Sequence, residues 1–472
     1  MKNRFETCEV TLTPLSPIHI SAGNPDYGWG AVWLPLQEKI FILDSERFSQ
    51  KLVESNLFEK YIEEVEKWIK LSDSEKEKQL NPCFKFLQEN SLQLFPNTDI
   101  NKFLQDLSAS EFNAPNGNRF IRNADGHAYI PGSSIKGAIR TAVIYAMLEE
   151  YKGQMKKDYL NDTYLKSFFD GMSPIPKNTG AGFDARKRMD EELLKSVFED
   201  FELTEKDDSE NIITFNRAKL GNGSITNLMR AILVSDSTPI PHIQKNLLDE
   251  EIKIVMLENP DLNGDRCLNR QALPYATNNN KKQCFEPNQQ PFITFKITID
   301  KEILRSFDSR LNAFPVVFKE IKDIEKIINA FYKKVYEVEQ EYYLDQLALP
   351  GEYNSNEERM IENVLDFYDK NTASYPKLLT NINIGLGSGM LYKTLFVAIK
   401  EEYRIKIRNL QMTKRQIDNQ RRGYNGRGNP IDWINKIAPN SRHLVFKNGI
   451  ATRPLGWANL KFGSITYEDS VL

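Results

Sequence analysis

The order in which β-type and helical segments follow one another constrains the fold of this chain most. Residues 4–13, RFETCEVTLT, are rich in β-formers and alternate in polarity, which is typical of a strand. The segments PFITFKITID at 291–300 and GWANLKF at 456–462 have the same character. Residues 316–349 instead repeat apolar side chains at helical spacing. Strands separated by helices in this ββ-rich order predict an α+β fold rather than a doubly wound parallel sheet.

A second long helix is predicted from PGSSIKGAIRTAVIYAMLEE, residues 131–150, because its apolar residues recur at three- and four-residue spacing. Ser133 or Ser134 is the expected N-cap of this helix. The preceding residues 119–130, RFIRNADGHAYI, contain a turn signal and predict a β-hairpin.

The start of this helix also suggests an anion-binding surface. Ser133, Ser134 and the first-turn amides would offer donors where helix N-termini attract anions. Lys136 and Arg140 are four residues apart and share one helix face, and Gly137 leaves room for a close backbone approach. An ordinary capped helix with solvated cations is the alternative that the sequence leaves open.

The stretch INIGLGSGMLYKTL, residues 382–395, is a strand followed by a glycine-rich loop. It misses the phosphate-binding P-loop pattern because Tyr392 stands where glycine must precede the lysine, Lys393. It misses the dinucleotide pattern because Met390 replaces the third glycine. An NTPase acting through Lys393 is therefore the weakest of the functions considered.

Exposed backbone amides give the same loop another use. Closely spaced glycines can form an anion-binding concavity, and a serine hydroxyl adds a donor. The residues that would contact a sugar-phosphate backbone are Gly385, Gly387, Ser388 and Gly389. A tight turn that needs a positive φ angle is the alternative, and it explains one glycine more readily than three.

Residues 404–427 are strongly basic, with eight lysines and arginines against the single acid Asp418. The whole chain carries a formal net charge of -3, which excludes a uniformly basic nucleic-acid binder but not a local basic patch. The segment NQRRGYNGRGNP adds flexible glycines and a tyrosine that could stack on a base. Arg421 and Arg422 within it are predicted to contact RNA.

Catalytic and metal-binding patterns are weak. His19 and Asp26 share one loop and could serve in acid–base cleavage of RNA, so an endoribonuclease is the alternative function. The four cysteines form no CxxC pair, which argues against a zinc ribbon, and no metal or cofactor is predicted. No run of 18 apolar residues or signal peptide is present, so a cytoplasmic protein without a membrane span is expected.

Five motifs occur in an order that resembles the RAMP superfamily proteins of type III-A CRISPR systems, and within them the subunit-five family of the Csm complex. They are PLSPIHISAG, YIPGSSIKGAIRTA, ILVSDS, IGLGSG and RPLGWANLKF. The resemblance implies two ferredoxin-like (RRM-type) domains with long helical and loop insertions. We expect them over residues 1–245 and 246–472.

The resemblance also implies a function. Such a subunit binds the 3′ side of the crRNA and caps the backbone of the complex, in contact with backbone RAMP subunits and the small subunit. Host nucleases for 3′ trimming are a further partner that it leaves open. The serine-rich helix start and the glycine loop would face the crRNA, with His19 among the contacts. Because target cleavage belongs to a different subunit of the family, and Asp26 does not match its motif, no intrinsic nuclease activity is expected.

Overall fold

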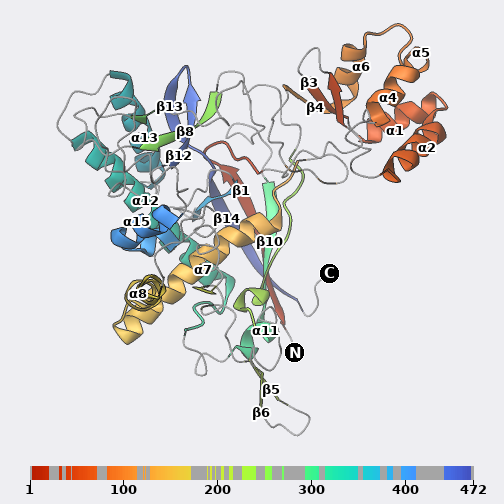
Figure 1. Cartoon of the computed structure of the whole chain (residues 1–472). Helices are drawn as coiled ribbons and strands as arrows, with labels where there is room; N and C mark the ends of the chain where they lie inside the picture. Colours follow the sequence, from red (N-terminus) through yellow and green to blue (C-terminus); the bar gives the residue numbers. More distant parts are fainter. Residues whose placement is uncertain are drawn as a thin grey trace.

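The computed structural model describes most of the secondary structure of the chain. The described residues are 3–20, 31–34, 39–43, 45–71, 82–113, 121, 123, 128–171, 189, 192–193, 197, 203–206, 212–215, 226–240, 250–257, 268–269, 293–307, 314–348, 355–372, 380–385, 395–410 and 441–468. They form an α+β protein, as the sequence predicts, with antiparallel sheets and long helices (Figure 1).

A five-stranded antiparallel sheet, the central sheet, forms the middle of the molecule. Its strand order is β11-β14-β1-β10-β7. The strands span Phe5–Pro14 (β1), Ile232–Val234 (β7), Ile293–Asp300 (β10), Thr380–Asn383 (β11) and Trp457–Glu468 (β14). The predicted strands at 4–13, 291–300 and 456–462 are therefore confirmed, and all three are neighbours in one sheet.

Two helices pack side by side against one face of this sheet (Figure 1): α7, Gly132–Met155, and α12, Ile321–Ala348. Strand β1 alternates, with Cys8, Val10 and Leu12 buried beneath the helices and Thr7, Thr11 and Thr13 on the other face. Burial of apolar side chains from both layers is the main favourable term in such a fold. The buried residues that the two helices contribute to this core include Ile135, Ile139, Val143, Met147, Ile324, Ile328, Phe331 and Val335.

The chain order β1-α7-β7-β10-α12-β14 with sheet order β14-β1-β10-β7 is the βαββαβ arrangement of a ferredoxin-like unit. This unit takes β1 and β7 from the first half of the chain and β10 and β14 from the second. The sheet therefore crosses the boundary expected at residues 245 and 246, and two consecutive ferredoxin-like domains stay a prediction.

A second antiparallel sheet has the order β13-β12-β8-β9. Its strands are Glu250–Leu257 (β8), Leu268–Asn269 (β9), Ser441–Lys447 (β12) and Ile450–Pro454 (β13), and helix α13, Ser355–Thr372, packs on β13. The Asn363 side-chain amide of α13 donates to the Ala451 carbonyl at 2.9 Å.

A buried ion pair joins this second sheet to the first unit. Arg442 of β12 and Glu339 of α12 approach to 2.7 Å, and both side chains are almost fully buried. Such a pair holds two elements in register, although removing one partner is costly because it leaves a buried charge.

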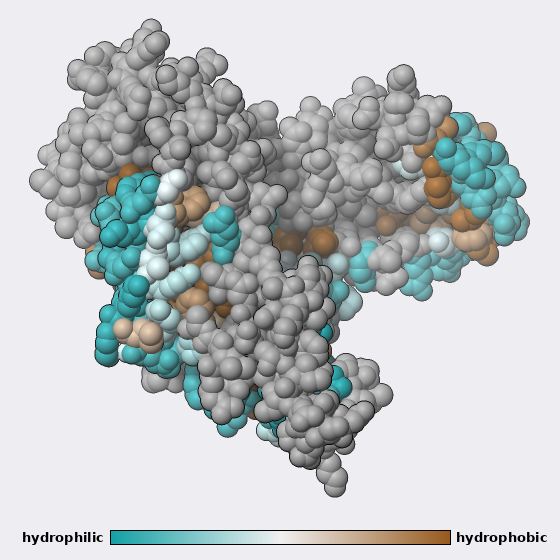
Figure 2. Space-filling view, turned by 60° about the horizontal axis from the view of Figure 1, so that its bottom comes forward, coloured by the Kyte–Doolittle hydropathy of each residue, from teal (hydrophilic) through white to brown (hydrophobic). Residues whose placement is uncertain are grey.

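A separate helical lobe follows β1 in the sequence and has its own hydrophobic core. In the described part of this lobe, β2 (Ala31–Leu34), β3 (Lys39–Leu43) and β4 (Ser108–Asn113) combine with five helices. The helices are α1 (Ser45–Glu54), α2 (Phe58–Ile69), α4 (Pro82–Glu89), α5 (Ser91–Leu94) and α6 (Ile100–Leu107). Figure 2 shows hydrophobic patches among the hydrophilic residues of this lobe, where Val53, Ile69 and Leu92 are more than half exposed. The helical insertion expected from the sequence is confirmed.

Shorter elements complete the described structure. They are a π-helical segment, Tyr159–Leu165, then α8 (Lys166–Asp170), the hairpin of β5 (Leu203–Lys206) and β6 (Ile212–Phe215), 3₁₀ turns at Leu228–Ala231 and Leu395–Ala398, α11 (Lys301–Ser306) and α15 (Glu401–Leu410). Ala128, in the segment expected to form a hairpin, pairs with Ile240. Most of that segment lies outside the described residues, so the hairpin stays a prediction.

Candidate functional site

The segments singled out in the sequence meet at one end of the central sheet, which we call the motif end. Strands β1, β7 and β11 end there, and the antiparallel strands β10 and β14 begin there. The motif end comprises residues 14–20, 131–140, 235–237, 384–385 and 455–457. They form two clusters, one on β1, β14 and β11 and one on β7, and β10 separates β1 from β7 by about 10 Å.

In the first cluster, three segments are tied together by backbone hydrogen bonds. The amides of Leu15 and Ser16 both donate to the Trp457 carbonyl, at 2.8 and 3.1 Å. Gly456 N–H donates to Pro17, and Ile384 N–H donates to Gly456, at 2.9 and 2.8 Å. The motifs PLSPIHI, NIG and PLGW are therefore neighbours that define one another's backbone conformation.

Gly385 is held against the backbone of His19. Its φ angle is +81°, and a Cβ placed on Gly385 would overlap the His19 carbonyl oxygen. The glycine is required here both for its left-handed conformation and for the close approach. The turn-forming interpretation of the glycine loop therefore explains Gly385, while Gly387, Ser388 and Gly389 lie outside the described residues.

His19 itself is fully buried. Its imidazole does not reach the surface in this conformation, so the structure offers no support for a direct RNA contact or for acid–base catalysis by this side chain. Asp26, its proposed catalytic partner, lies outside the described residues. The observed contribution of His19 to the motif end is its backbone carbonyl beside Gly385.

In the second cluster, the start of α7 differs from the prediction. The helix begins at Gly132 with Pro131 as its N-cap, and neither Ser133 nor Ser134 caps it. The Gly132 N–H instead donates to Oδ1 of Asp236, which follows β7, at 2.8 Å. A carboxylate from a distant segment has replaced the local serine cap.

The anion-binding interpretation of this helix start is weakened by the same contacts. Besides Gly132, the amides of Ser134 and Ile135 donate to the Pro131 carbonyl, at 2.9 and 3.3 Å. Three of the first four amides of α7 therefore already have protein acceptors. Because the carboxylate of Asp236 already stands at the helix N-terminus, a second anion is not favoured there.

The two cations of α7 follow within the next two helical turns. Lys136 is half-buried and Arg140 is exposed, and no acidic side chain in the described part of the chain pairs with either. Burial lowers the pKa of the Lys136 ammonium below its ordinary value. By contrast, Lys152 near the end of the same helix lies 3.5 Å from the Asp158 carboxylate. A half-buried cation without a counter-charge is where an external anion gains most.

Gly137, between the two cations, has open space where a Cβ would lie.

Only the first residues of the basic stretch are described. The Arg404 side chain donates to the Ile399 carbonyl at 2.6 Å, and the Lys406 ammonium lies 4.9 Å from the centre of the Tyr403 ring. These two cations are used in packing around α15. Arg421 and Arg422 fall outside the described residues, as does Lys393, so their contacts with RNA or nucleotide stay predictions.

Sequence reasoning missed Asp236 and Ser237. The Ser237 hydroxyl accepts from Ile130 N–H at 2.8 Å, and Ser237 N–H donates back to the Ile130 carbonyl at 3.0 Å. A run of short polar residues directly after a strand was the available signal, because such side chains often bond to nearby backbone groups. Gly132, the partner of Asp236, lies 104 residues earlier in the chain, and the sequence does not show that pairing.

Within the described ranges, no cluster of three or more metal-ligating side chains occurs. Of the described helices, none combines the length and the apolar character that crossing a bilayer requires.

The fold and the motif end define the chain as an α+β protein with a ferredoxin-like unit whose motifs gather at one end of its sheet. A family model for the RAMP superfamily matches residues 11–391, most of the chain. The protein therefore belongs to the RAMP superfamily. The expectation drawn from the order of the motifs is confirmed at this level.

One curated relative narrows the comparison. The chain is 34% identical over 151 residues to the "CRISPR system Cms protein Csm5" of Streptococcus thermophilus. The match covers 30% of this chain and 40% of the relative, so it spans less than half of that protein.

Two solved structures are similar over nearly the whole chain. A chain of a Csm-crRNA-target RNA ternary complex from a type III-A CRISPR-Cas system is 21% identical with a TM-score of 0.46, covering 96% of this chain and 100% of that one. Csm5 from T. onnurineus is 20% identical with a TM-score of 0.40, covering 95% and 99%. Neither score reaches 0.5.

Proposed function

We propose that this protein is a non-catalytic crRNA-binding subunit of a type III-A CRISPR Csm complex. In this role it caps the backbone of the complex at the 3′ side of the crRNA and supports crRNA maturation and antiviral defence. Its partners are crRNA, the backbone RAMP subunits and the small subunit. Membership of the RAMP superfamily and the 34% identity to a Csm5 protein support this assignment.

The observation that carries the proposal is the pair Lys136 and Arg140. Several lysines on the described surface lie beside an acid, such as Lys152 with Asp158 and Lys400 with Asp162. The two α7 cations do not, and Lys136 is in addition partly desolvated. An RNA phosphate would supply the missing negative charge, and contact with the backbone suits a guide whose sequence varies.

The buried imidazole of His19 supports the non-catalytic part of the proposal. An acid–base ribonuclease needs its catalytic group within hydrogen-bond reach of the substrate. A fully buried side chain does not meet that requirement in the described conformation. Glycine contacts and isolated cations at the motif end instead suit binding.

The first test is the RNA affinity of the double variant Lys136→Ala/Arg140→Ala. Binding to single-stranded RNAs of several unrelated sequences should weaken by about an order of magnitude at low salt, equally for each sequence. The slope of log K against log salt should become shallower by about 1.4, since each phosphate contact to a single strand contributes about 0.7. Filter binding over a salt series measures both quantities.

Lys152→Ala is the matched control, because it removes a cation from the same helix but one that is paired with Asp158. It should leave RNA affinity and salt slope close to those of the wild type. The midpoint of urea unfolding should be unchanged in the double variant, because neither cation has a described partner to lose. Unaltered RNA binding by a folded double variant would overturn the site.

The endoribonuclease alternative is tested separately. Purified protein incubated with labelled repeat RNA, with and without Mg²⁺, should yield no defined cleavage product. Cleavage that disappears in His19→Ala or Asp26→Ala would refute the non-catalytic assignment.

The position of this subunit along the crRNA is tested by photocrosslinking within the assembled complex. The chain should crosslink near the 3′ end of the crRNA rather than at the 5′ repeat tag.

A further inference from the structure

The entry of the chain into α7 is clamped from both sides of Pro131 by the residues that follow β7. Asp236 accepts the Gly132 N–H, and Ser237 exchanges two hydrogen bonds with Ile130. A Cβ on Gly132 would overlap the carbonyl oxygen of Val234, so the helix start lies directly on the end of the strand. The position of the first turn of α7 is therefore set by residues 234–237.

The cations of the proposed RNA site follow from that first turn. Lys136 lies four residues after Gly132 and thus on the same helix face, and Arg140 lies one further turn along. A shift or fraying of the first turn would move Lys136 directly. The rest of α7 is held by its buried face, so the position of the first turn depends on the contacts with residues 234–237.

We infer that Asp236 is a positioning residue for RNA binding: its carboxylate holds the start of α7 so that Lys136 and Arg140 face the phosphate backbone. This inference rests on the proposed function of the site. It assigns a role in RNA binding to a negatively charged, exposed side chain that would by itself repel RNA.

Electrostatics and positioning predict effects of opposite sign, which makes the inference testable. As a mere negative charge, Asp236 would weaken phosphate binding, and any neutral substitution would strengthen it. As a positioning residue, it is needed for its acceptor oxygen. Asn keeps that oxygen at the same place and is an equally good cap, whereas Ala does not.

The experiment compares Asp236→Asn and Asp236→Ala in the same salt-series RNA-binding assay. Asp236→Ala should lower affinity about fivefold and make the salt slope shallower, in spite of the lost negative charge. Asp236→Asn should bind RNA as tightly as the wild type or more tightly. Tighter binding by Asp236→Ala would overturn the inference.

A general loss of folding is separated from positioning by combining variants. Adding Asp236→Ala to Lys136→Ala/Arg140→Ala should cause no further loss of affinity, because the cations it positions are already absent. A further fivefold loss in that background would show that Asp236 acts elsewhere and would overturn the inference.

Hydrogen exchange distinguishes failure of the clamp from failure of the proposed function. Exchange of the amides at residues 132–135 should be faster in Asp236→Ala but not in Asp236→Asn, whether or not RNA binds. Unchanged exchange in Asp236→Ala would refute the clamp alone. If the two variants show this exchange pattern but the wild-type protein does not bind RNA, the proposed function is refuted, and with it the RNA role of Asp236.

Discussion

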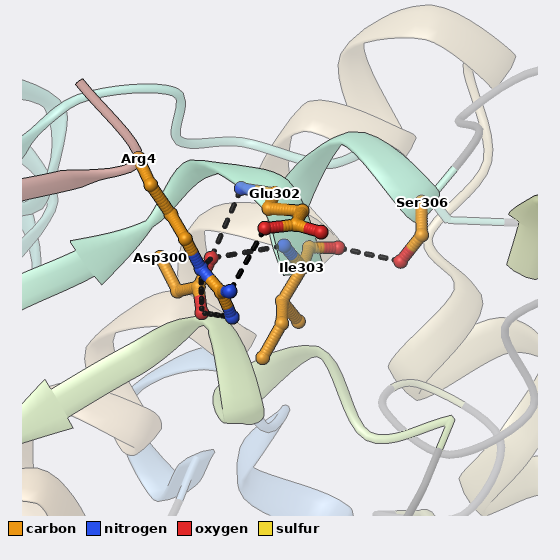
Figure 3. Close-up of polar contacts among 5 residues, drawn as sticks. All are labelled: Arg4, Asp300, Glu302, Ile303 and Ser306. Atoms are coloured by element: carbon orange, nitrogen blue, oxygen red, sulfur yellow. Dashed lines mark hydrogen bonds and ion pairs between the residues drawn. The ribbon is translucent and has the colours of Figure 1, made fainter. Parts of the chain in front are cut away.

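The two ends of the central sheet are closed by different kinds of interaction. At the motif end, backbone groups bond to one another across glycines, and the nearby cations Lys136 and Arg140 have no described acidic partner. At the opposite end, where β1 begins and β10 finishes, Arg4 pairs with Asp300 and Glu302, at 2.8 and 2.9 Å (Figure 3).

The opposite end also uses its acids to start helices. Asp300 accepts from the amides of Glu302 and Ile303 and so caps α11, as Figure 3 shows. The buried Glu6 carboxylate accepts from Ile321 N–H at the start of α12 and lies 2.6 Å from the Lys301 ammonium. The basic side chains there pair with acids of the same chain. At the motif end, backbone contacts and the single carboxylate of Asp236 hold the segments, and Lys136 and Arg140 are left available for an external anion.

The comparison predicts that the motif end is most sensitive to added side-chain volume. Gly385→Ala should destabilise the protein most, by about 3 kcal/mol, because it combines left-handed strain with overlap against the His19 carbonyl. Gly449→Ala is the control, since Gly449 also has a positive φ but open space around it, and should cost about 1 kcal/mol. Urea denaturation measures both, and equal losses would show that the overlap at Gly385 is relieved by movement.

Gly132→Ala should have the next largest effect, about 2 kcal/mol, since its Cβ would overlap the Val234 carbonyl without any left-handed strain. Gly137→Ala, five residues further along the same helix with nothing near its Cβ, should instead stabilise by about 0.5 kcal/mol. Thermal and urea unfolding check the two signs. Stabilisation by Gly132→Ala would contradict the close approach of α7 to β7.

The sequence predicted several elements of the fold but not the contacts between segments that lie far apart in the chain. The pattern predicted β1, β10, α7 and α12 because alternation and helical periodicity are local properties. It misplaced the cap of α7 because Asp236 reaches Gly132 from 104 residues away. It treated His19 as an available loop residue, although its side chain is fully buried in the folded chain.

The pairing of β1 with strands from the second half of the chain could not be predicted for a related reason. Strand β1 has one neighbour that begins at Ile293 and another that begins at Trp457, so each pairing joins residues far apart in the sequence. Pairing between distant strands leaves no local signal, whereas the helical lobe, built from consecutive elements, was anticipated as an insertion.

The smallest of the three effects concerns the charged end, and it depends on pH. Burial alone would raise the pKa of Asp300, but the Arg4 guanidinium and the amides of α11 outweigh it and hold the pKa below its ordinary value. A depressed carboxyl pKa adds stability that is complete above the unfolded-state value, about 3.9, and is lost as the pH falls through the folded-state value.

Asp300→Asn should therefore be less stable than the wild type at neutral pH, with a difference that closes as the pH falls below about 4. Urea midpoints measured from pH 7 down to pH 3 give this profile. The same series on Gly132→Ala is the control, because a steric defect should persist at every pH. If the stability difference between Asp300→Asn and the wild type did not narrow with acidification, the Arg4–Asp300 ion pair would not account for the stability of this end of the sheet.

The position of β1 between β10 and β14 has a consequence for the order of events during synthesis. Strand β1 is synthesised about 450 residues before its second neighbour, β14, which follows on the order of tens of seconds later. The helical lobe, whose core lies within residues 41–107, can close while the chain is still growing. The central sheet, and with it the motif end, is completed only after β14 has emerged, so a chain interrupted before Trp457 would lack the strand that holds PLSPIHI in place.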